Sequence, residues 1–244
     1  MKHARKTGRA CAFRGAVVVC LLVLTALVTV PRPAVADDAQ DAQQLVEKSR
    51  LTFEAFVADK DMGPPVKSLL KRAKGVLIYP QVLRAAFIFG ASGGSGTFLV
   101  HDAKAGAWGG PAFYTIGEAS FGLQAGGDAS EVVLVALTDR GVASLLSTST
   151  KLGGNIGIAV GPVGGGAEAA TANLSADVIS YSRSKGIYAG VSLDGAVVAT
   201  RGALNAAYYG KEATPTEILI QRAVTNPHAA SLIQAVSKEV GKKK

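Results

Sequence analysis

Residues 75–195 alternate between short apolar runs and glycines, and this pattern constrains the fold more than any other feature of the chain. Glycine supplies positive φ at tight turns and lets strands bend sharply. The pattern therefore predicts a curved, mainly antiparallel β-sheet, either a sandwich or a partly closed barrel. The glycine clusters expected between its strands are Gly93-Gly94, Gly109-Gly110, Gly126-Gly127, Gly153-Gly154 and Gly164-Gly165-Gly166.

The individual strands are predicted from the apolar runs themselves. Residues 131–138 (Glu-Val-Val-Leu-Val-Ala-Leu-Thr) form the strongest run, and its continuous apolar character indicates burial on both faces of the sheet. The other expected strands are residues 76–79, 86–89, 97–101, 112–116, 121–124, 156–160, 167–172, 178–182 and 187–193. No long polar linker separates them, which favours a single domain.

Helices are expected before and after this sheet. Residues 39–58 place apolar side chains at three- and four-residue spacing, which predicts an amphipathic helix. Gly63-Pro64-Pro65 breaks the chain, and a second helix is expected over residues 65–73. Further helices are expected at residues 139–147, 202–209, 215–224 and 228–240. The chain is therefore predicted to be α+β, helical over 39–73, β-rich over 75–195 and helical again over 202–240.

The first 36 residues have the pattern of a secretory signal peptide. Residues 1–14 carry five basic side chains and no acid, residues 15–30 are uncharged, and Ala34-Val35-Ala36 offers small side chains for cleavage. Residues 37–244 are then expected to form one exported domain, periplasmic or extracellular and associated with the cell envelope. Two alternatives stay open. One is an uncleaved anchor, although spanning a membrane takes about 20 apolar residues; the other is lipoprotein processing at Cys20.

Removal of this leader would change the cysteine content and the charge. Cys11 and Cys20 are the two cysteines of the chain, so the remaining residues would form no disulfide and no thiolate metal site. The leader also holds six of the 26 basic residues and none of the 18 acidic ones, which lowers the net charge from +8 to +2. Binding to nucleic acid needs a strongly basic surface, so we expect no nucleic-acid partner.

Catalytic motifs are weak in this sequence. Gly90-Ala91-Ser92-Gly93-Gly94 matches G-x-S-x-G, but a nucleophile elbow needs a helix after the serine, and residues 97–100 are predicted to be a strand. His101-Asp102 supplies too few ligands for a metal site. The glycine clusters lack the Gly-Lys-Ser/Thr of a phosphate-binding loop. We therefore expect no catalytic, metal-binding or cofactor-binding residues, and a protein that is not an enzyme.

Residues 181–195 (Tyr-Ser-Arg-Ser-Lys-Gly-Ile-Tyr-Ala-Gly-Val-Ser-Leu-Asp-Gly) are the most distinctive run of the chain. This run resembles the signature of the SYLF-domain family, which is known for lipid-binding proteins that include actin-patch proteins of yeast. Further matches follow in the expected order at residues 73–80, 108–114, 121–126, 152–154 and 161–164. One departure is Gly109-Gly110, where the family pattern has a serine between the tryptophan and the proline.

The resemblance implies a binding role. Some eukaryotic members of the family bind phosphoinositides, yeast members bind actin, and eukaryotic members often join the domain to a partner-binding module. An exported protein would meet neither ligand in its own envelope. For this chain the resemblance therefore implies a lipid-facing surface that recognises head groups other than phosphoinositides. The resemblance identifies no verified set of lipid-binding residues.

Two groups of basic residues are candidates for such a surface. Lys67, Lys71, Arg72 and Lys74 cluster on the second expected helix and its exit, with residues 67, 71 and 74 on one helical face. A basic face beside an apolar stripe can lie on an anionic membrane surface. In the signature run, Arg183 and Lys185 flank a serine and could bind a phosphate. The structural alternatives are a solvated helix face for the first group and a hairpin turn for the second.

Three functional hypotheses follow. The first is non-enzymatic association with anionic phospholipid or a membrane surface of the envelope. The second is a structural or protein-interaction module whose partner is another envelope protein. The third is a small-molecule carrier, which would need an apolar cavity within the sheet.

Overall fold

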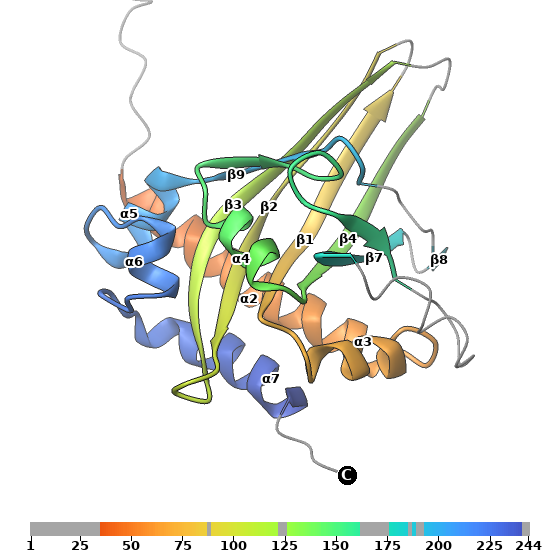
Figure 1. Ribbon diagram of the computed structural model, residues 1–244. Helices are drawn as coiled ribbons and strands as arrows, with labels where there is room; N and C mark the ends of the chain where they lie inside the picture. The colour runs from red at the N-terminus through yellow and green to blue at the C-terminus, as the bar shows by residue number, and fades with distance from the viewer. Residues whose placement is uncertain are drawn as a thin grey trace, which may run out of the picture. The chain divides into compact units, whose positions relative to one another are not determined.

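A computed structural model describes residues 35–86, 89–121, 126–161, 176–184, 187–188 and 193–240. The expected signal peptide lies outside these residues, except for Val35 and Ala36, which begin the first described helix. The fold is α+β, as predicted. One curled sheet, which is closer to a partly closed barrel than to a sandwich, is flanked by helices from both ends of the chain (Figure 1).

The described sheet has nine strands, and their order is β5-β9-β3-β2-β1-β4-β7-β6, with β8 paired to β7. All pairings are antiparallel except that of β6 with β7. The strands are β1 (Gly75–Ala86), β2 (Phe89–Asp102), β3 (Ala107–Phe121), β4 (Gly126–Ala136), β5 (Ser149–Lys151), β6 (Ile158–Val160), β7 (Val178–Ser184), β8 (Ile187–Tyr188) and β9 (Val197–Thr200).

The central strands are longer than predicted, because most glycine pairs lie inside strands and not between them. Gly93-Gly94, Gly109-Gly110 and Gly126-Gly127 belong to β2, β3 and β4, whereas Gly153-Gly154 forms a turn. Of the strand expected at 86–89, Ala86 belongs to β1 and Phe89 to β2, so these two residues are in different strands, and residues 87 and 88 lie outside the described residues. The expected strand at 167–172, the glycine cluster at 164–166 and residues 122–124 and 189–192 lie outside the described residues.

A bulge in β1 explains two of the glycines in β2. The pairing of β1 with β2 shifts register between Ile78 and Gln81, and its pairing with β4 shifts at the neighbouring positions. A Cβ atom at Gly94 would lie 2.3 Å from the carbonyl oxygen of Gln81, and one at Gly96 would lie 2.4 Å from that of Ile78. Glycine is therefore required here because the two backbones approach too closely for a side chain.

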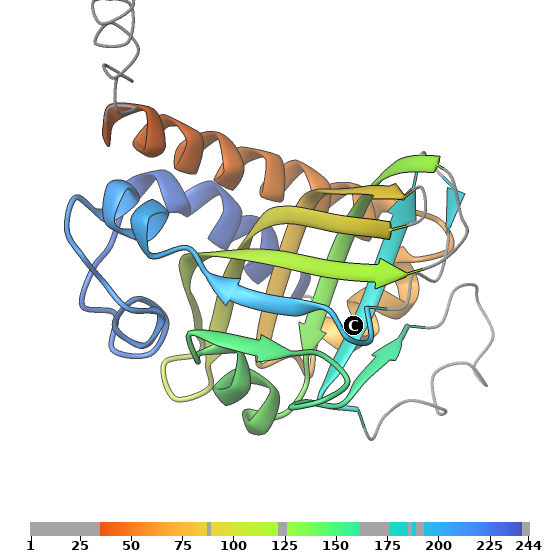
Figure 2. The ribbon, with the colours of Figure 1, turned by 90° about the horizontal axis from the view of Figure 1, so that it is seen from above.

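Helices and loops cover both faces of the sheet (Figure 2). One face packs on α2 (Val35–Ala58), α3 (Gly63–Leu70), α5 (Gly202–Tyr209) and α7 (Ala230–Val240). The other face packs on α4 (Asp139–Leu145), on α6 (Pro215–Leu219) and on the loop that precedes β9. Val133 and Val135 of β4 point to the first face, and Val132 and Leu134 to the second. This two-sided burial confirms the interpretation of the continuous apolar run at 131–138.

Three of the expected helices end earlier than predicted, and the smallest difference is at α4, which ends at Leu145 and not at residue 147. Helix α3 ends at Leu70 because the chain turns into the sheet, where the N–H of Lys74 donates to the carbonyl of Ala136 at 2.8 Å. Helix α6 ends at Leu219 and is followed by Arg222, whose φ of 53° is left-handed and incompatible with a helix. A short 3-10 turn, Pro227–Ala229, then leads into α7. Among the described residues, no helix is long and apolar enough to cross a membrane.

The bulge makes a testable prediction about stability. Substitution Gly96→Ala should lower the free energy of unfolding by about 1–3 kcal/mol, because the added methyl group meets the Ile78 carbonyl and the Tyr79 ring. Gly93→Ala in the same strand is the matched control, since its Cβ would meet only the Ile116 oxygen at 3.7 Å. Urea denaturation of both variants measures the difference. Equal stabilities would contradict the close approach of β1 and β2.

Candidate functional site

The candidate functional site lies where the end of β2 is close to α4 and α6. A groove with a volume of about 740 Å3 lies there, on the face of the sheet opposite α2. Its apolar side chains come from three segments that are far apart in the sequence: Val100 from β2, Val142 and Leu146 from α4 and the residue after it, and Leu219 and Ile220 from the end of α6. Valine, leucine and isoleucine from separate elements thus form one apolar wall.

Part of this apolar wall faces solvent. Val100, Val142 and Leu219 are buried at the base of the groove, and Leu146 is half-buried. The side chain of Ile220 is 49% exposed. Exposed single apolar residues are common on protein surfaces, and Ile220 differs from them in lying beside the apolar floor of a groove.

The end of α6 is held over the groove by Arg222. Its guanidinium donates to the carbonyl of Ala107 at 2.9 Å and lies 3.8 Å from the Asp102 carboxylate. A Cβ atom at Gly109 would lie 3.2 Å from the Arg222 Nε, and one at Gly110 would lie 2.9 Å from a methyl group of Leu219. The glycine pair that departs from the family pattern is therefore the surface on which the end of α6 packs.

Charged side chains of both signs form the rim of the groove. Lys74 donates to the carboxylate of Asp139 at 2.5 Å, which joins the residue before β1 to the start of α4. Asp102 accepts hydrogen bonds from the backbone N–H groups of Lys104 and Ala105, and these bonds lower the pKa of its carboxyl group. The ammonium group of Lys104 makes no ion pair with a described residue. The rim is therefore polar, with two lysines and two aspartates.

Aromatic packing lies behind this rim. His101 is one of the residues that line the groove, and its ring lies 5.2 Å from the ring of Trp108, the only tryptophan of the chain. Trp108 is buried in the core between the sheet and α2, on the face opposite the groove. Within the described residues, no group of three His, Asp or Glu side chains is placed to hold a metal ion. His101 thus belongs to the groove and also contacts the tryptophan ring.

The structure separates the predicted basic residues. Lys67 is half-buried on α3, while Lys71 and Arg72 are exposed at its end, and the three side chains make no ion pair or hydrogen bond with a described residue. The expected helical face that joins residues 67, 71 and 74 is wrong, because α3 ends at Leu70. Lys74 instead extends the sheet and forms the rim of the groove.

Of the second predicted pair, Arg183 and Lys185, the structure describes only Arg183. Arg183 lies on β7 and forms an ion pair with Glu131 of β4, in which its Nε donates to the carboxylate at 2.8 Å. Its guanidinium carbon also lies 5.3 Å from the centre of the Phe56 ring. Lys185 lies outside the described residues. The proposed phosphate contact of these two residues stays a prediction.

The G-x-S-x-G motif has no catalytic geometry. Ser92 lies inside β2, where its backbone pairs with Arg84 on β1 and Glu118 on β3. A nucleophile elbow places the serine on a turn between a strand and a helix. That arrangement is not formed at this motif.

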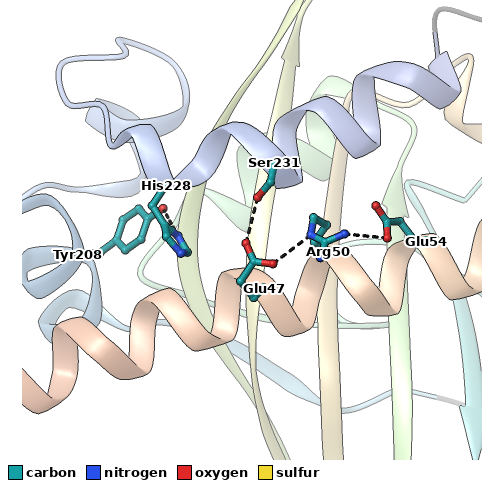
Figure 3. A network of polar contacts seen from close by, with 6 residues as sticks. All are labelled: Glu47, Arg50, Glu54, Tyr208, His228 and Ser231. Atoms are coloured by element: carbon teal, nitrogen blue, oxygen red, sulfur yellow. Dashed lines mark hydrogen bonds and ion pairs between the residues drawn. The ribbon is translucent and has the colours of Figure 1, made fainter.

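A separate polar network joins the two long helices (Figure 3). Glu47 of α2 accepts hydrogen bonds from the Arg50 Nε at 3.0 Å and from the Ser231 hydroxyl of α7 at 3.1 Å. Arg50 also donates to Glu54 at 2.9 Å. The hydrogen bond from Arg50 is the main reason that the pKa of Glu47 is lowered. Since these charges are paired with one another, the network acts as a link between α2 and α7.

Comparison with known proteins places the chain in a family. Residues 117–239 match the family model described as "Ysc84: Las17-binding protein actin regulator". The chain belongs to the Ysc84 family. This is the SYLF-domain family that the signature run resembles, so the resemblance is confirmed. The matched residues include α4 and α6 of the groove.

Yeast and human relatives share much of the domain. Protein YSC84 of Saccharomyces cerevisiae is 37% identical over 186 residues, which cover 74% of this chain and 38% of the yeast protein. LAS seventeen-binding protein 3 of the same yeast is 37% identical over 173 residues, 69% of this chain and 37% of that protein. Human SH3 domain-containing YSC84-like protein 1 is 34% identical over 153 residues, 62% of this chain and 44% of that protein. The chain therefore spans about two-fifths of the length of these relatives.

Helix α4 forms one wall of the groove, and a short hydrogen-bond relay fixes its first turn. The Thr138 hydroxyl accepts from the N–H of Gly141 at 2.9 Å and donates to the Asp177 carboxylate at 2.6 Å. This second bond is the main reason that the pKa of Asp177 is lowered. A carboxyl group whose pKa is lowered by folding contributes stability above its unfolded pKa, and that stability is lost as the pH falls through the folded pKa.

Substitution Thr138→Val should therefore lower the free energy of unfolding by about 1–2 kcal/mol at pH 7, since it removes the cap. The difference from the unsubstituted protein should shrink below about pH 4, the ordinary range of an aspartate, because protonated Asp177 no longer gains from the hydroxyl. Denaturant titrations at several pH values measure this effect, with exposed Thr148→Val as the control. A difference that is constant with pH would contradict the relay.

Proposed function

We propose that this protein is a non-enzymatic binding protein that associates with a lipid or membrane surface of the cell envelope. The observation that carries the proposal is the set of three cations at the end of α3, since Lys67, Lys71 and Arg72 have no intramolecular partner among the described residues. Charges that stabilise nothing within the fold are available to an external anion. The membership of a family known for binding proteins supports the same role.

The physics of this surface favours an anionic membrane. Each basic side chain close to such a surface contributes about 1 kcal/mol, and the attraction decays over about 10 Å at 0.1 M salt. Pro64 and Pro65 in the first turn of α3 give this short helix a rigid start. Lys67 lies in the last turn of α3, and Lys71 and Arg72 follow its end directly, so the three cations are close together along the chain and can meet the same anionic surface.

Vesicle binding tests this proposal. Protein purified after export should sediment with vesicles that contain phosphatidylglycerol, and not with pure phosphatidylcholine vesicles, and sodium chloride should weaken the binding. The variant Lys67→Glu/Lys71→Glu/Arg72→Glu should bind at least about tenfold more weakly, since three attractions of about 1 kcal/mol become repulsions. Lys74 is left intact in this variant because it is paired with Asp139.

A second charge reversal provides the control. Lys48, Lys151 and Lys211 are exposed on α2, on β5 and after α5, so their replacement by glutamate changes the net charge equally without touching α3. Binding by this control variant should stay close to that of the unsubstituted protein. Equal loss in both variants would show that binding depends on net charge alone and would overturn the role of α3.

A protein partner is the alternative for the same surface. The relative named LAS seventeen-binding protein 3, and the family description "Las17-binding protein", state that these relatives bind a protein. In this chain the corresponding proposal is an envelope protein as the partner. Such an interface would survive in a lipid-free extract, whereas adsorption to a membrane would not.

The location in the envelope is proposed from the pattern of residues 1–36. Protein recovered from the envelope fraction of an expressing cell should begin at Asp37, as intact-mass spectrometry can determine. A mass that includes residues 1–36 would instead support the uncleaved anchor. A diacylated N-terminus at Cys20 would support lipoprotein processing.

A further inference from the structure

The groove between β2, α4 and α6 is separate from the three cations Lys67, Lys71 and Arg72, and the family membership assigns no role to it. Its volume of about 740 Å3 falls within the range of about 300–1,000 Å3 that is usual for small-molecule sites. Its floor is apolar, its rim is charged, and one isoleucine stands half-exposed at its edge. These features together fit an amphiphile, that is, a ligand with one apolar part and one polar part.

The size of the groove favours a slender ligand over a helix of a partner protein. One turn of an α-helix, with a diameter of about 10 Å and a pitch of 5.4 Å, fills about 420 Å3. The groove would therefore enclose fewer than two turns, which is too short for the anchors that a docked helix uses at successive turns. A single acyl chain can lie along Val142, Leu146 and Ile220 without this limit.

The charges on the rim determine which head group fits. Lys104 carries an ammonium group without an ion pair among the described residues, so it can receive a phosphate. Asp139 is paired with Lys74, but its side chain is 89% exposed, and a carboxylate can accept more than one donor. A cationic ammonium with N–H groups can therefore donate to Asp139. A purely anionic head group would find Asp102 and Asp139 opposing it.

We propose that the groove binds a single-chain amphiphile with a zwitterionic phosphoethanolamine head, the acyl chain lying on Val142, Leu146 and Ile220, the phosphate at Lys104 and the ammonium at Asp139. This ligand is a lysophospholipid and not a bilayer. The site is therefore independent of the adsorption of α3 to a membrane. Either proposal can hold without the other.

The single tryptophan provides a direct readout. Trp108 lies 5.2 Å from His101, and His101 lines the groove, so occupancy of the groove should change the fluorescence of this tryptophan. Titration of the purified exported protein with lysophosphatidylethanolamine, below its critical micelle concentration, should give a saturable change. Lysophosphatidylglycerol of the same chain length should bind at least about fivefold more weakly, because its head lacks the ammonium. Absence of any saturable change would overturn the proposal.

Two substitutions test the apolar part. Ile220→Asp places a charge on the wall, and Ala143→Phe fills the groove from an exposed position of α4, so neither changes a buried residue. Each should weaken the binding of lysophosphatidylethanolamine at least about tenfold. Val197→Asp is the control, because Val197 is 42% exposed on β9 and does not line the groove. Equal affinities for the Ile220 and Val197 variants would overturn the site.

One substitution tests the head group. Asp139→Asn removes the negative charge that attracts the ammonium and ends the ion pair with Lys74, so the preference for lysophosphatidylethanolamine over lysophosphatidylglycerol should disappear or reverse. Circular dichroism establishes that the variant is folded. An unchanged preference in a folded variant would show that Asp139 does not recognise the head group and would overturn that part of the proposal. Loss of vesicle binding in the α3 variant with unchanged lysophospholipid binding would support two separate sites.

Discussion

The close approach of β1 and β2 at the bulge is the constraint on which the rest of the structure depends. Gly94 and Gly96 let the backbone of β2 lie against the carbonyl groups of Gln81 and Ile78, where no side chain would fit. A bulge of this kind increases the local twist and bends the strand. The curled sheet has two apolar faces, and each is covered by helices. The groove exists because α4 and α6 cover the second face without closing over the end of β2.

Much of this fold is predictable from local patterns, and the failures have a common cause. The two-sided burial of 131–138 follows from its unbroken apolar run, and the helices at both ends follow from three- and four-residue spacing. The lengths of β1 and β2 cannot be predicted in this way, because the sequence does not distinguish a glycine inside a strand from a glycine in a turn. Only the register between strands distinguishes the two, and register depends on contacts between distant residues.

The candidate site was harder to predict than the fold. The basic residues near 67–74 are visible as a cluster, but the end of α3 at Leu70 depends on the hydrogen bond of Lys74 with Ala136, which is remote in the sequence. The groove leaves no local signal, since its walls come from three separate segments. Arg222 is the residue whose role comes closest to indicating the groove. However, its left-handed backbone and its contact with Ala107 are properties of the folded chain alone.

The contact between α2 and α7 has a consequence for when the chain can fold during its synthesis. These helices come from opposite ends of the described chain, and the bond from Ser231 to Glu47 joins residues that are 184 positions apart. Leu232 and Val236 of α7 complete the same core that α2 begins. A ribosome that has not yet released residues 230–240 therefore holds a chain whose helical core is incomplete. Stable folding of this domain therefore requires that residues 230–240 have first left the ribosome.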